Sequence, residues 1–550
     1  MNRSENVKRL QNETFDLVII GGGASGAGCA LDAATRGLKV ALIDRDDFSA
    51  ATSSRSTKLV HGGVRYLEQA FKNADLAQLR MVQHGLQERH IVLQNAPHLA
   101  HPLGLITPVF SWLEGLYFSI GLRLYGWFAR HDSLPKAKWL SKEETLARMP
   151  TLTPKLHSSV LYYDGQLDDA RYNLALVQTA HQAGATVVNY AEVIDFERDA
   201  SGKLTALMVQ DRLTDETLTV RSRLFLNCTG PYADAIRQLA NPLLTKRIRP
   251  SKGVHITLPE EVLQSQDALL IPKTPDGRVI FSIPFAGKVI IGTTDDDYRT
   301  LNDEPELHLS EAHFLLDTVG PYLAKKPVVS DVIAGFGGIR PLIAADPNAE
   351  TTKGLVRDHE VEHDPASNLI SLLGGKWTTY RLMAQDAINT VCERLDQIER
   401  PCQTASYRLV GADNYHPDNW QKLAKVHQLT EATARHLSQT YGGLADQVIA
   451  ILSEHESYRE YLVEGYPYLK AEVIYQARYE MACRPRDVLA RRLRLELLDW
   501  NAVYTATPTV AHLLAEELGV NDAEMQQAID QYQQQINEFQ ASASGVGVIQ

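Results

Sequence analysis

The chain has 550 residues, of which 44% are hydrophobic and 22% charged, so it is long enough for two to four domains of a soluble globular protein. A net charge of −12, with no block rich in lysine or arginine, argues against a nucleic-acid partner. No apolar run reaches the roughly 18 residues that span a bilayer, and no hydrophobic signal region follows the N-terminus, so membrane contact would be peripheral.

The first predicted unit is a strand, a helix and a second strand near the N-terminus. Residues 15–20 are typical of a buried parallel strand, 24–36 of a helix and 39–43 of the next strand. Such a βαβ unit is the building block of parallel sheets that bind nucleotides. The sequence therefore predicts an α/β fold with a Rossmann-like domain at the start of the chain.

The turn inside this unit has the pattern G-x-G-x-x-G. Gly21 permits the tight turn, Gly23 lets a pyrophosphate approach the backbone, and Gly26 lets helix and strand pack closely. Asp44 ends the second strand, where a carboxylate can accept hydrogen bonds from ribose hydroxyls. The predicted dinucleotide contacts are Gly21, Gly23, Ala24, Ser25, Gly26 and Asp44. This unit alone does not distinguish NAD from FAD, whereas the acid at the strand end disfavours a 2′-phosphate.

Five separated stretches carry a family resemblance. They are 49–71, 164–185, 227–234, 289–298, and 335–342 together with 372–381. In this order they closely resemble the FAD-dependent glycerol-3-phosphate dehydrogenases of aerobic bacteria and mitochondria. The resemblance implies a glycine oxidase or amino-acid oxidase-like cofactor domain, an antiparallel substrate domain, an all-α C-terminal domain and non-covalently bound FAD.

The predicted domains are discontinuous in sequence. The FAD-binding domain is expected in 15–70, 155–245 and 335–400, and the substrate-binding domain in 71–154 and 246–334. The alternating pattern of 278–294 favours strands in the latter. A helical C-terminal domain is expected over 405–540, with a flexible tail at 541–550.

The resemblance also implies further flavin contacts. Ser53, Ser54 and Lys58 are expected to donate through hydroxyl and ammonium groups, and Gly230 to lie in a second turn beside the cofactor. The remaining implied contacts are His61, Gly62, Gly63, Gly338, Gly375, Lys376 and Thr378.

Three cations follow glycine pairs, namely Arg65, Arg340 and Lys376. Arginine and lysine both hold and orient a phosphate dianion through charge-assisted hydrogen bonds. We therefore expect these residues to bind a phosphorylated substrate, and the resemblance adds Tyr66 and Arg357.

Two histidines are candidates for the base that removes a hydroxyl proton, because imidazole titrates near neutral pH. His255 is the preferred candidate, and His61 is the alternative, with packing against the flavin as its other role. The predicted catalytic residues are His255, Arg340 and Lys376. The reaction could also proceed without a dedicated base if Arg340 or Lys376 lowers the pKa of the substrate hydroxyl.

No metal site is expected. The acidic run 295–306 has Thr300 where a calcium loop needs glycine, and no cluster has zinc spacing. The five cysteines are odd in number and contain no C-x-x-C pair, which indicates free thiols in a reducing compartment. We expect a cytoplasmic protein that lies peripherally on the inner face of the cell membrane.

The segment 110–140 mixes aromatic residues with cations and includes Trp112, Trp127 and Trp139, a composition that suits a bilayer interface. Packing on the core or against a second copy in a homodimer is the alternative. The expected reaction is oxidation of sn-glycerol 3-phosphate to dihydroxyacetone phosphate, with hydride transfer to FAD and electrons passed to a membrane quinone. The alternatives are a glycerol-3-phosphate oxidase that forms hydrogen peroxide, an oxidase of amines or amino acids, and a non-catalytic flavoprotein.

Overall fold

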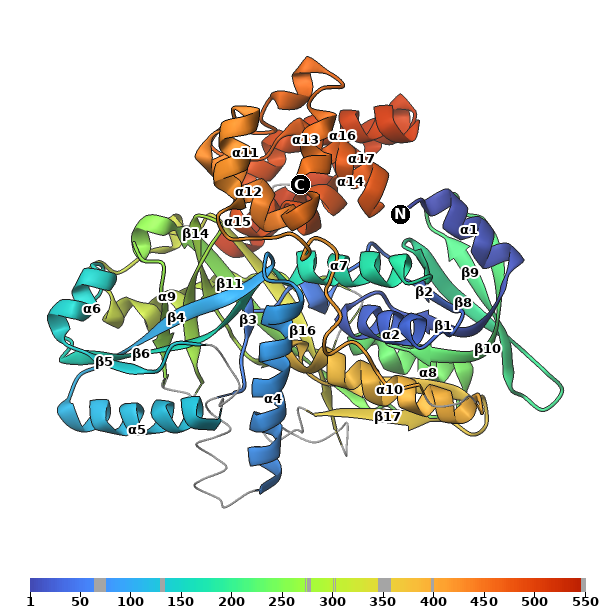
Figure 1. Cartoon of the computed structure of the whole chain (residues 1–550), viewed down its shortest axis with the longest axis horizontal. Coiled ribbons are helices and arrows are strands. Elements are labelled where there is room, and N and C mark those ends of the chain that lie inside the picture. Colours follow the sequence, from blue (N-terminus) through green and yellow to red (C-terminus); the bar gives the residue numbers. More distant parts are fainter. Residues whose placement is uncertain are drawn as a thin grey trace.

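A computed structural model describes residues 1–545 apart from 64–75, 129–133, 273, 275–277, 300, 302, 345–357 and 397–399. The chain forms two sheets that lie side by side, and a group of helices covers them at one end (Figure 1). None of the described helices is both long and apolar enough to cross a membrane.

The first sheet has a parallel centre. Its strands, in spatial order, are β17 (His359–His363), β18 (Leu369–Gly374), β10 (Thr217–Asn227), β1 (Thr14–Ile20), β2 (Val40–Ile43) and β7 (Thr186–Val188). The pairs from β18 to β7 are parallel, whereas β17 is antiparallel to β18. A meander of β8 (Ala191–Arg198) and β9 (Leu204–Asp211) joins the sheet through β10.

The residues of β1 alternate between two apolar layers, as a strand buried on both faces requires. Leu17 and Ile19 pack on one side with α2 (Ala24–Thr35), α7 (Asp169–Gln182) and α10 (Tyr380–Arg394). Val18 and Ile20 pack on the other side with β8, β9 and α8 (Ala233–Ala240). The predicted βαβ unit and the Rossmann-like fold are therefore confirmed, with bounds that differ by one residue.

The second sheet is mostly antiparallel. Its central path, in spatial order, is β15 (Asp296–Asp297), β11 (Ile248–Pro259), β14 (Lys288–Gly292), β13 (Ile280–Phe285), β12 (Ala268–Ile271), β4 (Ala100–Val109), β6 (Ser158–Leu167) and β3 (Leu59–Val60), with β16 (Ala334–Ile343) on β11 and β5 (Lys138–Leu140) on β6. Only the β4–β12 pair is parallel among its described pairs. Helices α4 (Leu76–Asn95), α5 (Trp112–Phe128), α6 (Lys142–Arg148) and α9 (Leu309–Val319) accompany it.

Three strands depart from the predicted domain boundaries. The sequence predicts β3, β6 and β16 in the cofactor domain, but they pair within the second sheet. The long pairing of β16 with β11 accounts for this placement, because ten consecutive residue pairs join the two strands. Alternation of apolar residues indicates a strand but does not say which sheet it joins.

The C-terminal domain is helical, as predicted. Its elements are α11 (Asn419–His427), α12 (Glu431–Tyr441), α13 (Ala445–Ile451), α14 (Lys470–Glu480), a π-helical turn (Asp487–Arg492), α15 (Leu495–Leu498), α16 (Trp500–Leu518) and α17 (Asp522–Ser544). The side chain of Asn521 caps α17 by accepting from the amide of Glu524. Since α17 runs to Ser544, the described residues 541–545 end a helix and do not form the expected flexible tail.

One apolar core joins the C-terminal helices to the second sheet. Val254 and Ile256 of β11 belong to the same buried cluster as Leu437 of α12 and Val473 of α14. The C-terminal domain is therefore part of the fold and not a separate appendage.

Candidate functional site

A cavity of about 1640 Å³ lies between the two sheets. One side is formed by the turns that follow β1, β2, β10 and β18, and the other by β11 and β16. Ligands of open α/β sheets bind outside the carboxyl ends of the parallel strands. Since pockets for small ligands usually measure about 300–1,000 Å³, this one has room for a dinucleotide and a second molecule.

Most of the predicted site residues line this cavity. They are Gly21, Gly23, Ala24, Ser25, Asp44, Ser53, His61, Gly62, Gly63, Gly230, His255, Gly338, Arg340, Gly375, Lys376 and Thr378. Arg65, Tyr66 and Arg357 lie outside the described residues. The structure therefore brings together, around one space, predicted residues that are up to 357 positions apart in sequence, from Gly21 to Thr378.

The β1–α2 turn forms a cradle of bare backbone. Gly23 is the N-cap of α2 and has no side chain that could accept from the first amides of the helix. Instead Ser53, from the segment after β2, places its Oγ 2.9 Å from the amide nitrogen of Ala24. The N-terminus of α2 thus faces the cavity with the positive end of its dipole, which suits a pyrophosphate.

Gly26 has a structural role in this cradle and does not line the cavity. A Cβ at this position would lie 1.9 Å from the carbonyl oxygen of Gly21. Only glycine lets the helix approach the turn so closely, which agrees with the packing role expected for the third glycine of the motif.

Asp44 lies at the carboxyl end of β2 and faces the same cavity. Its Oδ2 accepts from the amide of Gly22 at 2.6 Å, and its Oδ1 accepts from the amide of Asp46 at 2.9 Å. Burial raises the pKa of Asp44 to about 7 in spite of these two hydrogen bonds. A carboxylate held in this way has lone pairs available for ribose hydroxyls.

The glycines fit a bound flavin dinucleotide for a second reason. Gly21, Gly63, Gly230 and Gly375 all have positive φ, with values of 105°, 83°, 56° and 93°. Side chains are disfavoured at such positions, and a Cβ on Gly230 would meet no atom within 4 Å. The space next to Gly230 is therefore open to a ligand, and FAD is a group that these turns and Asp44 accommodate.

The flavin contacts predicted for Lys58 and Ser54 are not found, because neither residue lines the cavity. The ammonium of Lys58 is fully buried and lies 2.8 and 2.9 Å from the carboxylate oxygens of Asp169. Burial lowers the pKa of Lys58 to about 7. Ser54 is also buried, and its hydroxyl donates to the carbonyl of Ala51. Both residues stabilise the segment behind the cavity wall, in place of the predicted flavin contact.

Arg340 stands on β16, on the side of the cavity that β11 and β16 form. Its guanidinium donates to the carboxylate of Asp295 at 3.1 Å, the hydroxyl of Thr293 at 3.0 Å and the carbonyl of Thr294 at 3.0 Å. Its side chain remains 26% exposed. A partly exposed guanidinium with a fixed orientation can add an anionic ligand to its existing partners.

Lys376 follows Gly374 and Gly375 at the end of β18 and also lines the cavity. Its Nζ lies 3.4 Å from Sδ of Met81 on α4. Thr378 is buried, and its hydroxyl accepts from the amide of His61 at 3.4 Å. The β18 turn and the His61 segment are thus in direct contact at the cavity wall.

The two candidate histidines differ in access. His255 is 2% exposed, stacks on Phe336 with ring centroids 4.7 Å apart, and places Nε2 2.9 Å from the hydroxyl of Thr57. Burial, and then the charges of Lys58 and Arg340, hold the pKa of His255 well below its usual range. His61 is exposed to the cavity, and the protein packed around it lowers its pKa as well. Both rings are therefore neutral at neutral pH.

Residues that the sequence analysis did not single out support this part of the site. Tyr125 of α5 accepts from the amide of Gly62 at 2.7 Å and donates to Asp164, which also pairs with Arg89. These partners come from three separate elements, so no local pattern could have indicated them. The network fixes the backbone next to His61.

Because the pKa of Asp44 is raised to about 7, the apoprotein protonates this carboxyl in the range where cofactor binding is usually measured. The ionised form accepts the ribose hydroxyls, so we expect FAD affinity to fall as the pH drops below 7, by up to about tenfold per pH unit. Titration of the apoprotein with FAD at several pH values between 5.5 and 8.5 measures how the affinity depends on pH. Asp44→Asn removes the titrating group, so a slope that persists in that variant contradicts the role of Asp44.

Comparison with known proteins agrees with the geometry. A family model described as FAD dependent oxidoreductase matches residues 16–376, and one described as the C-terminal domain of alpha-glycerophosphate oxidase matches residues 402–525. The mitochondrial glycerol-3-phosphate dehydrogenase of Arabidopsis thaliana is 39% identical over 96% of this chain and 87% of its own length. The human mitochondrial glycerol-3-phosphate dehydrogenase is 39% identical over 96% of this chain and 74% of its own length.

Solved structures give the same result. The structure of glycerol-3-phosphate dehydrogenase from Bacillus halodurans, complexed with FAD, is similar with a TM-score of 0.81 at 28% identity, covering 100% of this chain and 99% of that one. An L-alpha-glycerophosphate oxidase from Mycoplasma pneumoniae, with FAD bound, shares the fold with a TM-score of 0.54 at 16% identity over 72% of this chain and 99% of that one. The cofactor is therefore FAD, and the chain belongs to the family of FAD-dependent glycerol-3-phosphate dehydrogenases.

Proposed function

We propose that this protein oxidises sn-glycerol 3-phosphate to dihydroxyacetone phosphate and passes the electrons to a quinone in the membrane. The observation that carries the substrate proposal is the position of Arg340 and Lys376 on the wall of the cavity that also contains the cofactor cradle. The names of the relatives support the same substrate. When bound, FAD supplies the acceptor for the hydride that leaves C2 of the substrate.

The protein's own contribution is to bind and orient the substrate. The guanidinium of Arg340 and the ammonium of Lys376 provide the charge that a phosphate dianion requires. Arg340 is held by Asp295 and Thr293, so its planar donors have one fixed direction. A fixed phosphate places the C2 hydroxyl of the substrate in a single position, which lowers the entropic part of the barrier.

A histidine on the cavity wall takes the hydroxyl proton. The accessibility of the two rings favours His61 over His255, the candidate preferred from sequence. His61 is open to the cavity, whereas His255 is 2% exposed and already shares its Nε2 with Thr57. We therefore assign proton removal to His61 and give His255 the role of supporting the wall.

The cavity reaches α5, which supports a quinone as the acceptor. Tyr117, Phe118 and Leu122 of this helix line the cavity. The same helix, with Phe110 just before it, exposes a surface that we call the α5 patch, formed by Phe110, Trp112, Leu113, Leu116, Tyr117 and Ile120. Leu113 reaches 71% exposure. A single helix thus connects the flavin cavity with an apolar surface, which is the arrangement a lipid-soluble acceptor needs.

The α5 patch is also the proposed membrane contact. Apolar and aromatic side chains on a surface helix bind the boundary between headgroups and acyl chains. Trp139 packs behind this surface, because a Cβ on Gly115 would touch its ring at 2.3 Å. The side chain of Trp127 lies outside the described residues. We place the protein in the cytoplasm, on the inner face of the cell membrane.

Loss of either cation should impair the reaction. We expect Arg340→Ala and Lys376→Ala each to lower kcat/KM for glycerol 3-phosphate by more than tenfold, about 1.4 kcal/mol, because a charge-assisted hydrogen bond to phosphate is lost. The measurement is the rate at which the substrate bleaches flavin absorbance under anaerobic conditions. Arg435→Ala, an exposed residue of the C-terminal domain, is the control. If both variants remain within tenfold of the unmodified enzyme, the proposed substrate site is wrong.

The choice of base is tested with His61→Asn and His255→Asn. General base catalysis contributes roughly 10²–10⁴-fold, so we expect His61→Asn to slow flavin reduction by at least about 10²-fold and His255→Asn by much less. A base must be neutral, and the pKa of His61 is lowered. The rate should therefore decline only below about pH 6.5 in the unmodified enzyme. The reverse ranking of the two variants would assign the proton to His255.

The acceptor and the membrane contact are tested together. We expect Leu113→Glu with Ile120→Glu to release the protein from washed membranes and to lower quinone reduction, while flavin bleaching by substrate is unchanged. Leu243→Glu, at a 90% exposed site away from α5, should change neither. A homodimer that dissociates in the double variant, with membrane binding unaffected, would make the patch a contact between two copies. Hydrogen peroxide formed in proportion to substrate under air would identify an oxidase.

A further inference from the structure

The cavity wall nearest to the cofactor cradle has little regular structure of its own. Between β2 and β3 the chain forms a segment, residues 47–58, that contributes most of its residues to the cavity lining. Its only described regular element is a short 3-10 turn, Thr52–Ser54. We call residues 47–58 the cofactor segment. Because it has no ladder or long helix to hold it, its position depends on contacts with other parts of the fold.

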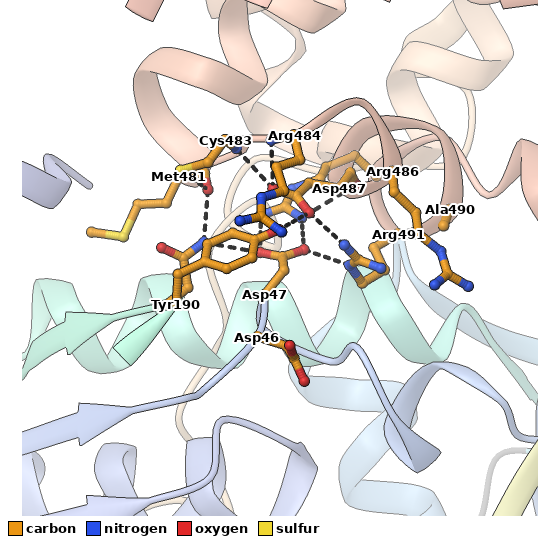
Figure 2. Close-up of polar contacts among 12 residues, drawn as sticks. Asp46, Asp47, Tyr190, Met481, Cys483, Arg484, Arg486, Asp487, Ala490 and Arg491 are labelled. Carbon is orange, nitrogen blue, oxygen red and sulfur yellow. Dashed lines mark hydrogen bonds and ion pairs between the residues drawn. The ribbon is translucent and has the colours of Figure 1, made fainter. Parts of the chain in front are cut away.

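The strongest of these contacts come from the C-terminal domain. The π-helical turn Asp487–Arg492 and the residues around it, 486–496, which we call the arginine turn, lie against the cofactor segment. Figure 2 shows Asp47 directed toward the arginine side chains of this turn. π-Helical turns are rare and are frequently found at functional sites.

Asp47 is the first point of attachment and is fully buried. Arg491 places its Nε 2.5 Å from Oδ2 of Asp47, and Arg492 donates from both terminal nitrogens, with Nη2 at 3.0 Å from Oδ1. Asp487 pairs with Arg491 in turn, and the hydroxyl of Tyr190 donates to Asp487 at 2.6 Å (Figure 2). The carboxylate of Asp47 is therefore fixed by two guanidinium groups from another domain.

The second attachment is the carbonyl oxygen of Ser54, in the middle of the cofactor segment. It accepts from Nη2 of Arg494 at 3.0 Å and from Nζ of Lys58 at 2.8 Å. Both cations also bind the buried carboxylate of Asp169. A backbone carbonyl of the segment is thus held by a cation from the C-terminal domain.

Arg55 makes the third attachment. Its guanidinium pairs with Glu304 at 2.6 Å and with Glu496 at 3.2 Å, and Arg486 bridges the same two carboxylates. Three points spread along one short segment are thus tied to one turn of the C-terminal domain. The segment between them carries Ser53, whose hydroxyl binds the amide of Ala24 at the cofactor cradle.

We propose that the arginine turn of the C-terminal domain positions the cofactor segment and thereby sets how long FAD stays bound. Arg491, Arg492 and Arg494 are positioning residues in this proposal, since they act through Asp47 and Ser54 and do not line the cavity. Coupling of this kind is reciprocal, so bound FAD also stabilises the docking of the C-terminal domain.

The test measures FAD release from the holoenzyme and uses no substrate, so it is independent of the proposed reaction. Holoenzyme is diluted, and the rise in flavin fluorescence gives the dissociation rate, while circular dichroism in the visible range reports the environment of the bound flavin. We expect Arg492→Met to increase the dissociation rate at least tenfold, and Arg492→Lys, which keeps the charge, to increase it less.

Arg171→Met is the matched control. Arg171 of α7 forms a buried pair with Glu480 of α14 at 2.7 and 2.8 Å, so it also joins the two domains, but it makes no described contact with the cofactor segment. We expect Arg492→Met and Arg171→Met both to lower the unfolding temperature, and only Arg492→Met to accelerate FAD release and alter the flavin spectrum. Equal acceleration in both variants, or none in either, would overturn the proposal. If Arg492→Met does not fold, the comparison of Arg492→Lys with Arg171→Lys decides in the same way.

Discussion

The site depends on one close contact between backbones. A Cβ on Gly26 would lie 1.9 Å from the carbonyl oxygen of Gly21, and a Cβ on Gly21 would lie 2.7 Å from that of Cys228. At this point α2, β1 and β10 meet with no side chain between them. A larger residue would separate the helix from the sheet and move the N-terminus of α2 away from the cavity. The positions of Asp44 and Ser53 are then also lost, because both bind amides of this turn.

The features of the site that can be predicted from sequence are those determined by residues close together in the chain. Gly21, Gly23 and Gly26 belong to one turn between two apolar runs, and both strands and the helix appear within one residue of the expected bounds. The cations Arg340 and Lys376 were found because each follows a glycine pair and matches a family motif. Such features need only neighbours in sequence, so their recognition did not require the fold.

The parts that sequence missed depend on distant partners. The family motif around Lys58 predicts a flavin contact. Its ammonium instead forms an ion pair with Asp169, which lies 111 residues further along the chain. The sheet to which β6 and β16 belong is decided by their pairing with β4 and β11. The low exposure of His255 also comes from distant partners, because its ring stacks on Phe336 and lies against Gly292. In each case the deciding contact joins segments that no local pattern connects.

The C-terminal domain meets the rest of the protein through two kinds of contact that do different work. Against the second sheet it contributes to a common apolar core, and apolar burial is strong but non-directional. Against the cofactor segment it uses buried ion pairs, whose net stabilisation is small because both charges lose their hydration. Such pairs are directional, however, and removing one partner leaves a buried charge at a cost of about 3–5 kcal/mol. The apolar core therefore attaches the C-terminal domain to the second sheet, while the ion pairs hold the cofactor segment in one position. Apolar packing would also serve stability at the surface of the cofactor segment, so we attribute the ion pairs there to the demand for a fixed cavity wall.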